Sequence, residues 1–243
     1  MIPVIGIPYL NRPDLLERCL RSIDRKVDTV VIVNNSDSLI TSDYDLSKRI
    51  CVDSMKCQSN SFYIAEMPLN AGVAASWNEV IKLFPAPWWL IVNSDIEFAP
   101  GDLAKFEQAI QTTEAGIVAD GINNMACFGI TANCVQRVGL FDENFFPAYG
   151  EDIDYMRRCR LLGVEHRYLQ GTGMRHDRSS TVKALPAELQ DRNRETFEAN
   201  KAYYERKWGG WEGQETFEHP FNDPGWPVWA WKFDCRMRKE QQW

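Results

Sequence analysis

The sequence contains no long hydrophobic run. Nothing in it approaches the ~18 uninterrupted apolar residues that a membrane-spanning helix requires. Its first residues, MIPVIGIPYLNRPD, also lack the charged and apolar segments of a signal peptide. We therefore expect a protein without a transmembrane segment that works in the cytoplasm.

Basic residues are fewer than acidic residues. The chain has 27 Lys and Arg against 34 Asp and Glu, a net charge of -7. Nucleic-acid backbones are bound by clustered Lys and Arg, so this balance argues against a nucleic-acid partner. An acidic protein that handles a diphosphate commonly brings a divalent cation to it, which directs attention to the carboxylates.

Paired cysteines are absent as well. None of the seven cysteines forms a CxxC motif, which argues against a zinc site or a redox pair. Cys19 and Cys159 fall on the apolar stripes of expected helices, where a reduced thiol behaves as a small hydrophobic side chain. We expect the cysteines to be buried and reduced.

Short apolar runs alternate with helical patterns over the first 120 residues. Strands are expected at residues 2–7, 29–33, 61–65 and 89–92, with Pro8 ending the first, and helices at 13–23, at 74–84 and after 102. This alternation predicts an α/β fold with a mainly parallel sheet covered on both faces. Such sheets bind ligands beyond the carboxyl ends of their strands, here the polar loops 8–12, 34–38 and 93–95.

The alternation weakens after residue 121. We expect one domain over residues 1–180, with a nucleotide-binding half (1–120) and an α+β catalytic half (121–180). A C-terminal extension (181–243), with a helix at 186–208, would pack on this domain. The extension is rich in tryptophan: Trp208, Trp211, Trp226, Trp229 and Trp231. Burial is the commonest role of tryptophan, but stacking on acceptor sugars and contact with a membrane surface both stay open.

A carboxylate follows the most apolar of the expected strands. Asn93-Ser94-Asp95 comes directly after residues 89–92, so Asp95 is placed at the ligand-binding edge of the sheet. A divalent ion that bridges two phosphates needs one or two such oxygens. Taken alone, Asp95 is more typical of a residue that caps a turn, and the other motifs favour the metal role.

Two further carboxylates open a helix. Glu151 and Asp152 follow Gly150, where the helix N-terminus favours anions, so we expect lowered pKa values and ionised side chains. An ionised carboxylate can act as a general base, although a charged helix cap explains the same pattern. His176 follows an expected strand at 165–169 and fits either a structural role or a metal ligand.

The order of these motifs resembles glycosyltransferase family 2 and related GT-A enzymes. The similarity covers about residues 2–180 and is carried by eight segments: Pro8–Pro13, Val31–Ser36, Leu69–Gly72 with Asn78, Asn93–Asp95, Val138–Phe146, Glu151–Asp154, Arg157–Gly163 and His176. The Asn93–Asp95 segment is similar to the DXD-type metal motif of the family.

The resemblance implies a GT-A fold and a role for each motif. Asp95 and His176 would hold Mn²⁺ or Mg²⁺ at the diphosphate of a nucleotide-sugar donor, with a UDP-sugar favoured. Asp152, with Glu151 beside it, would be the base that deprotonates a carbohydrate or other hydroxyl acceptor in an inverting transfer. The donor nucleotide would be bound by Pro8, Tyr9, Asn11, Arg12, Asn34, Asn70, Gly72, Asn78, Asn93 and Ser94.

The sequence departs from the family pattern at two positions. Asn34 stands where the family often has Asp, but an amide can still accept from an imide N–H. Asn93 replaces the first carboxylate of the DXD-type motif, which removes one anionic contact to the metal.

Two other functions stay open. A nucleotidyltransferase would usually carry a Gly-rich loop and a Lys after the first strand, and neither follows Ile7. A non-catalytic nucleotide-sugar or carbohydrate-binding module would share the fold, and turnover of a nucleotide sugar would separate it from an enzyme.

Overall fold

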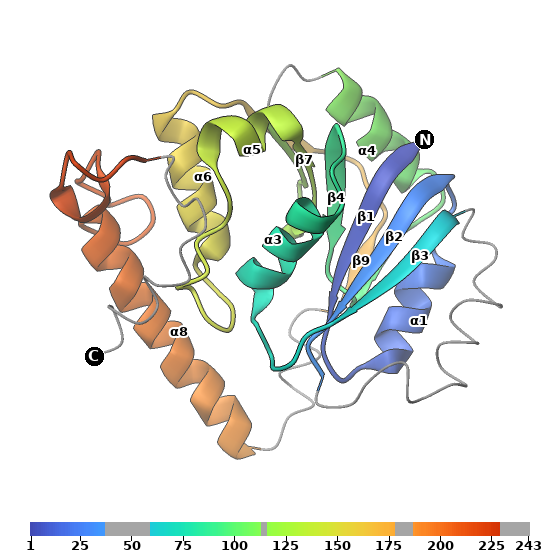
Figure 1. Ribbon diagram of the computed structural model, residues 1–243, viewed down its shortest axis with the longest axis horizontal. Helices are drawn as coiled ribbons and strands as arrows, with labels where there is room; N and C mark the ends of the chain where they lie inside the picture. The colour runs from blue at the N-terminus through green and yellow to red at the C-terminus, as the bar shows by residue number, and fades with distance from the viewer. Residues whose placement is uncertain (37–58, 113–115, 178–186, 229–243) are drawn as a thin grey trace.

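A seven-stranded sheet forms the centre of the molecule (Figure 1). The computed structural model describes residues 1–36, 59–112, 116–177 and 187–228. The strand order is β3-β2-β1-β4-β7-β6-β8. Strands β3, β2, β1 and β4 are parallel, β7 runs antiparallel between β4 and β6, and β8 is parallel to β6. The strands are β1 (Ile2–Tyr9), β2 (Val27–Asn34), β3 (Ser59–Glu66), β4 (Trp88–Val92), β6 (Ile117–Asp120), β7 (Asn124–Thr131) and β8 (His166–Leu169). The mainly parallel α/β sheet is confirmed.

Helices cover both faces of this sheet. On one face lie α1 (Pro13–Arg21) and α4 (Asp102–Gln111), and on the other lie α3 (Val73–Leu83), α5 (Ala132–Val138) and α6 (Glu151–Leu161). Successive side chains of a strand point to opposite faces, so Ile32 joins the core under α1 whereas Val31 and Val33 join the core under α3. The uninterrupted apolar runs of the sequence follow from this two-sided burial.

Strand β1 is longer than the sequence predicts. It runs through Pro8 to Tyr9, and Pro8 lies opposite Val33 of β2. On its other side β1 pairs with β4 only at Ile5 and Gly6. Proline therefore stands where no partner on the β4 side requires an N–H, and the expectation that Pro8 ends the strand is wrong.

A second sheet of two short strands lies beside the main one. Strand β5 (Ile96–Glu97) pairs antiparallel with β9 (Arg175–His176), and neither strand is expected from the sequence. Two-residue strands carry no hydrophobic periodicity, so pattern analysis cannot detect them.

The long helix α8 (Ala187–Trp208) runs along the outer side of the molecule, with its C-terminal end next to α6, and the short helix η3 (Pro220–Asn222) follows it (Figure 1). Tyr203, Tyr204 and Trp208 pack on Phe145, which precedes α6. This contact agrees with the expected burial of Trp208, whereas Trp229 and Trp231 lie outside the described residues.

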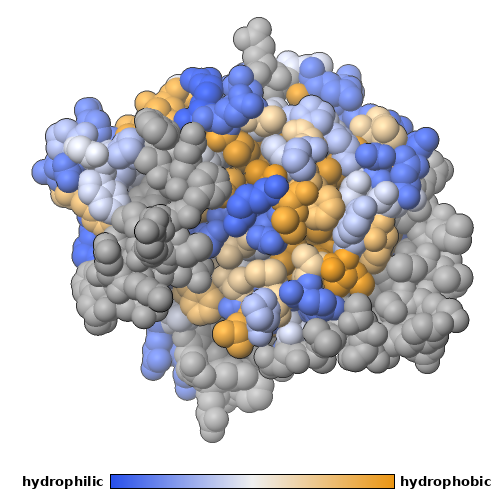
Figure 2. Space-filling model, in the orientation of Figure 1, coloured by the Kyte–Doolittle hydropathy of each residue, from blue (hydrophilic) through white to orange (hydrophobic). Residues whose placement is uncertain are grey.

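The described cysteines are buried free thiols, at Cys19, Cys127, Cys134 and Cys159, as expected. Cys51, Cys57 and Cys235 lie outside the described residues. Within the described ranges, every helix is too short or too polar to span a membrane. The face that carries α3 and α5 shows apolar surface at its centre, with hydrophilic residues among it (Figure 2).

Candidate active site

The two expected metal ligands are neighbours in the structure. Asp95 lies in the turn between β4 and β5, and the pairing of β5 with β9 sets Ile96 opposite His176. His176 Nε2 consequently lies 3.3 Å from Asp95 Oδ1, and both side chains are largely shielded from solvent. Asp95 and His176 are 81 positions apart in the sequence. The pairing of β5 with β9, which the sequence does not predict, brings them together.

The pair fits one divalent cation. Two ligands at ~2.1 Å from an octahedral Mg²⁺ or a similar ion stand ~3 Å apart, which agrees with the observed 3.3 Å. His176 Nδ1 is buried and has no hydrogen-bond partner among the described residues. No cluster of three or more His, Cys, Asp or Glu side chains in the described ranges could hold a metal. The remaining ligands would be water and substrate phosphates, as is common for Mg²⁺.

Two arginine side chains, Arg12 and Arg18, lie near this pair. Arg12, the N-cap residue of α1, bonds Asp14 at 2.9 and 2.7 Å, and Asp14 chiefly raises the pKa of Arg12. Burial opposes this shift, while Asp177 and Asp95 add to it, which puts a permanent positive charge close to Asp95. Arg18 in turn bonds Asp177, next to His176. Two arginines, each bonded to an aspartate, therefore lie near the Asp95–His176 pair.

Asn34 is fully buried at the end of β2 and is held from two sides. Its Oδ1 accepts from the backbone N–H of Ser36 at 3.0 Å, which fixes the amide so that Nδ2 donates to Glu66 Oε2 at 2.5 Å. Glu66 ends β3 in register with Asn34. A carboxylate therefore stands beside the position where the family often has Asp, and sequence reasoning missed it. The indication in the sequence is one acidic residue, Glu66, directly after the expected strand at residues 61–65.

Strand β1 contributes to this edge mainly through its backbone. The Tyr9 side chain packs in the core, and its carbonyl accepts from Asn35 N at 2.9 Å. Pro8 is half-buried within the strand. Asn11 has a positive φ of 52° and donates its backbone N–H to Ser36 Oγ at 2.8 Å. These contacts bring the loops after β1 and β2 together, as the sequence predicts for parallel neighbours.

The loop before α3 contacts the segment that leads into α6. Asn70 Oδ1 accepts from Gly72 N, and Asn35 Oδ1 accepts from Ala71 N, both at 2.9 Å. Gly72 has φ 82°, and a Cβ there would lie 2.8 Å from the carbonyl oxygen of Pro147. The next N–H, of Val73, donates to that same oxygen at 2.7 Å. Only glycine permits this close approach of the loop before α3 to the segment that leads into α6.

Asn78 has a different position from the one expected. Its side chain is buried in α3, where Nδ2 donates to the Phe141 carbonyl and Oδ1 accepts from the Phe141 N–H, both at 2.9 Å. Both polar ends are engaged inside the protein, so Asn78 braces α3 against the 141–143 segment. Asn93 and Ser94 remain in the turn before β5 beside Asp95, half-buried and buried respectively.

Glu151 and Asp152 begin α6 after two residues with positive φ, Tyr149 at 78° and Gly150 at 101°. Burial raises the pKa of both carboxyl groups, and the Asp152 charge adds to the shift of Glu151. The expected lowering of these pKa values is wrong because the loss of water outweighs the N–H groups of the helix terminus. Asp152 is consequently a stronger base than a surface aspartate.

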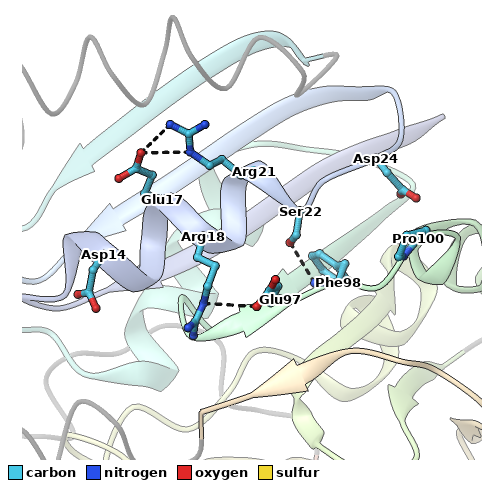
Figure 3. A pocket seen from close by; sticks show the side chains of 9 residues that line it. All are labelled: Asp14, Glu17, Arg18, Arg21, Ser22, Asp24, Glu97, Phe98 and Pro100. Carbon is cyan, nitrogen blue, oxygen red and sulfur yellow. Dashed lines mark hydrogen bonds and ion pairs between the residues drawn. The ribbon is translucent and has the colours of Figure 1, made fainter.

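A separate pocket lies away from these residues. It measures about 520 Å³ and lies between α1 and the segment 97–100 (Figure 3). Six of its nine lining residues are charged: Asp14, Glu17, Arg18, Arg21, Asp24 and Glu97. The other three are Ser22, Phe98 and Pro100. None of the expected donor, metal or catalytic residues lines it, so we do not assign it to the donor.

Comparison with known proteins identifies the family. The model of Glycosyl transferase family 2 matches residues 4–140, more than half of the chain. A galactofuranosyl glycosyltransferase from Leishmania donovani is 22% identical over 273 aligned positions, which cover 84% of this chain and 62% of that protein. The chain thus spans about three fifths of this relative.

Solved structures share the fold. The mannosyltransferase PcManGT from Pyrobaculum calidifontis, in complex with GDP-Man and Mn²⁺, superposes with a TM-score of 0.57 at 15% identity, covering 69% of this chain and 54% of that one. TarS 1–349 from S. aureus gives 0.55 at 12% identity, covering 86% and 74%. TarS 1–349 in complex with UDP gives 0.52 at 13% identity, covering 70% and 58%. These likenesses establish the GT-A fold. The family match over more than half of the chain shows that the chain belongs to glycosyltransferase family 2.

Proposed function

We propose that the protein transfers a sugar from a nucleoside-diphosphate donor, with UDP favoured, to the hydroxyl group of an acceptor. The observation that carries this proposal is the Asp95–His176 pair, 3.3 Å apart at the carboxyl edge of the sheet. Relatives of the same fold have been solved with GDP-Man and Mn²⁺, and with UDP, which supports a nucleotide sugar as the ligand class.

Asp95 and His176 would hold Mn²⁺ or Mg²⁺ together with oxygens of the donor diphosphate. A bound divalent ion supplies positive charge that stabilises the leaving nucleoside diphosphate. Arg12, whose guanidinium lies close to Asp95, adds a second positive charge at the same place. The nucleoside would lie along the edge formed by Asn11, Asn34 and the 70–72 loop.

Asp152 serves as the base in this proposal. The acceptor oxygen forms a bond to the anomeric carbon while the bond from that carbon to the diphosphate oxygen breaks, and Asp152 takes the hydroxyl proton. Attack from the side opposite the leaving group inverts the anomeric configuration. Burial raises the pKa of Asp152, which brings its basicity closer to neutral pH.

Titration calorimetry with UDP tests the donor and metal parts together. UDP should bind at least ~10-fold more tightly with Mn²⁺ than with EDTA, and Asp95→Asn should remove most of that difference. Glu97→Gln is the matched control, because Glu97 lies two residues away in β5 and is paired with Arg18 at 3.5 Å. Equal UDP affinity with Mn²⁺ and with EDTA would refute the metal role.

Turnover separates an enzyme from a binding module. Release of UDP from a UDP-sugar panel should be measurable in the wild-type protein and strongly reduced in Asp95→Asn. Binding of UDP without any turnover across the panel would favour the non-catalytic reading.

A further inference from the structure

Three aromatic side chains from separate segments meet next to Asp152. Tyr149 lies three residues before it, Phe197 lies in α8, and Trp211 follows α8. The ring centroids are 5.6 Å apart for Tyr149 and Phe197 and 6.3 Å apart for Phe197 and Trp211. All three side chains are half-buried, whereas nearby Trp208 is fully buried. The three rings therefore leave part of their surface accessible.

Several contacts fix these rings relative to the proposed base. Asn200 of α8 donates to the carbonyl groups of Ala148 and Tyr149, at 2.8 and 3.0 Å. This ties the middle of α8 to the residues just before Glu151. On the other side, Arg157 of α6 donates to the Phe217 carbonyl at 2.8 Å, which holds the chain after α8 against α6.

An additional carboxylate stands at the edge of this aromatic surface. Glu212 follows Trp211 and is exposed. Burial of part of the side chain raises the pKa of Glu212, and the charges of Asp152 and Glu215 add to this shift while Arg160 opposes it. Glu212 is therefore close enough to Asp152 for their charges to interact.

We infer that Tyr149, Phe197 and Trp211, with Glu212 at their edge, form the acceptor subsite and bind an uncharged sugar ring. This assignment rests on the proposed function, because it takes Asp152 as the base. Apolar C–H faces of a sugar pack on aromatic rings, and sugar hydroxyl groups donate to carboxylate oxygens. The charges of Asp152 and Glu212 disfavour an acceptor that carries phosphate at this position.

Saturation-transfer NMR with simple glycosides tests the subsite without turnover. The probes are methyl β-D-glucopyranoside, methyl β-D-galactopyranoside and methyl α-D-mannopyranoside, with glucose 6-phosphate as the anionic comparison. At least one neutral glycoside should bind, and Trp211→Ala should weaken its affinity at least ~10-fold. Glu212→Gln should weaken it ~3-fold. Trp226→Ala is the matched control, because Trp226 packs on Phe221, with ring centroids 4.9 Å apart, outside this cluster.

Melting curves accompany every variant, and Phe197→Leu replaces Trp211→Ala if the latter unfolds. Unchanged glycoside affinity in folded Trp211→Ala or Phe197→Leu would overturn the assignment. Glucose 6-phosphate binding as tightly as the neutral glycosides would also overturn it. So would Trp211-dependent co-sedimentation with phosphatidylcholine–phosphatidylglycerol vesicles without glycoside binding, which would assign the surface to a membrane.

The binding experiments distinguish a wrong acceptor subsite from a wrong proposed function. A thermal shift with UDP and Mn²⁺ but no glycoside binding would refute the subsite and leave the donor site intact. Glycoside binding that depends on Trp211, without any nucleotide binding, would support the aromatic surface and refute the transferase.

Discussion

The proposed donor edge of the sheet and the contact between α6 and α8 are built from different forces. At the donor edge, polar side chains follow β1, β2 and β4, and the backbone of a parallel sheet brings them together. Between α6 and α8, fully buried charges meet: Lys207 Nζ lies 2.8 Å from Asp142 Oδ2 and 2.5 Å from Asp154 Oδ1. The arrangement of the sheet edge depends on strand topology. The stability of the α6–α8 contact depends on each buried charge having a partner of opposite charge.

The buried charges form a closed network. Arg158 Nε donates to Asp154 Oδ2 at 2.9 Å, and Trp208 Nε1 donates to Asp154 Oδ1 at 2.8 Å. Burial works against the Asp142 charge, but Lys207, Asn144 and Tyr203 outweigh it and lower the pKa of Asp142. The network joins α8 to the helix that begins with Glu151 and Asp152, so the C-terminal segment helps to position the proposed base.

The largest effect is expected on catalysis, from Asp152→Asn. Asparagine keeps the size of the side chain but cannot take a proton, so kcat should fall at least ~100-fold. UDP affinity with Mn²⁺ should stay within ~2-fold, since Asp152 lies on the acceptor side. Wild-type kcat/KM should decline as the pH falls through the raised pKa of Asp152, because the base must be ionised. Steady-state kinetics across pH measure both effects, and wild-type turnover in Asp152→Asn would make Glu151 the next candidate.

Lys207→Met should have the largest effect on stability. It leaves Asp142 and Asp154 buried with one cation fewer, and breaking a buried ion pair costs about 3–5 kcal/mol. Urea unfolding should therefore show a large loss in the free energy of unfolding.

Lys201→Met on the same helix is the control. Lys201 makes an exposed pair with Glu205 at 4.0 Å, and such pairs contribute about 0–1 kcal/mol. An equal loss of unfolding free energy in Lys207→Met and Lys201→Met would mean that the buried charge network contributes no more stability than an exposed ion pair.

A moderate, pH-dependent effect is expected from Glu151→Gln. Below pH ~4.5 the carboxyl group is protonated in both the folded and the unfolded chain. Above this pH the unfolded chain ionises first, so the buried Glu151 lowers wild-type stability progressively until the pH passes its raised folded pKa. The melting temperature of Glu151→Gln relative to wild type should therefore rise by a few degrees between pH 4.5 and pH 8, since each pKa unit corresponds to about 1.4 kcal/mol.

Glu198→Gln, at an exposed position of α8, controls for the loss of one charge. A difference between Glu151→Gln and wild type that is constant with pH would contradict the burial of an uncharged Glu151.

The sequence predicts the sheet well because strands that are buried on both faces consist of continuous apolar runs, such as residues 29–33. It also predicts that Asp95 and Asn34 lie at the ligand edge, since strand ends are visible as changes in polarity. It does not show Glu66 beside Asn34, because these two residues become neighbours only through the pairing of β2 with β3. Nor does it reveal Lys207 as buried, because lysine is rarely buried without a partner and its partners come from distant segments.

The smallest effect is expected at the pocket of Figure 3. Glu17 and Arg21 line it and form an i,i+4 pair on α1 at 2.7 Å, with 25% and 50% of their side chains exposed. Pairs of this kind contribute about 0.3–0.5 kcal/mol, so Glu17→Gln should change the free energy of unfolding by no more than that. Calorimetry should find the same UDP affinity with Mn²⁺ as in the wild type, because Glu17 belongs to neither the strand edge nor the metal pair. A tenfold loss of UDP affinity would instead place the donor in this pocket, and the contrast between a donor edge set by strand ends and a catalytic side set by buried charges would no longer hold.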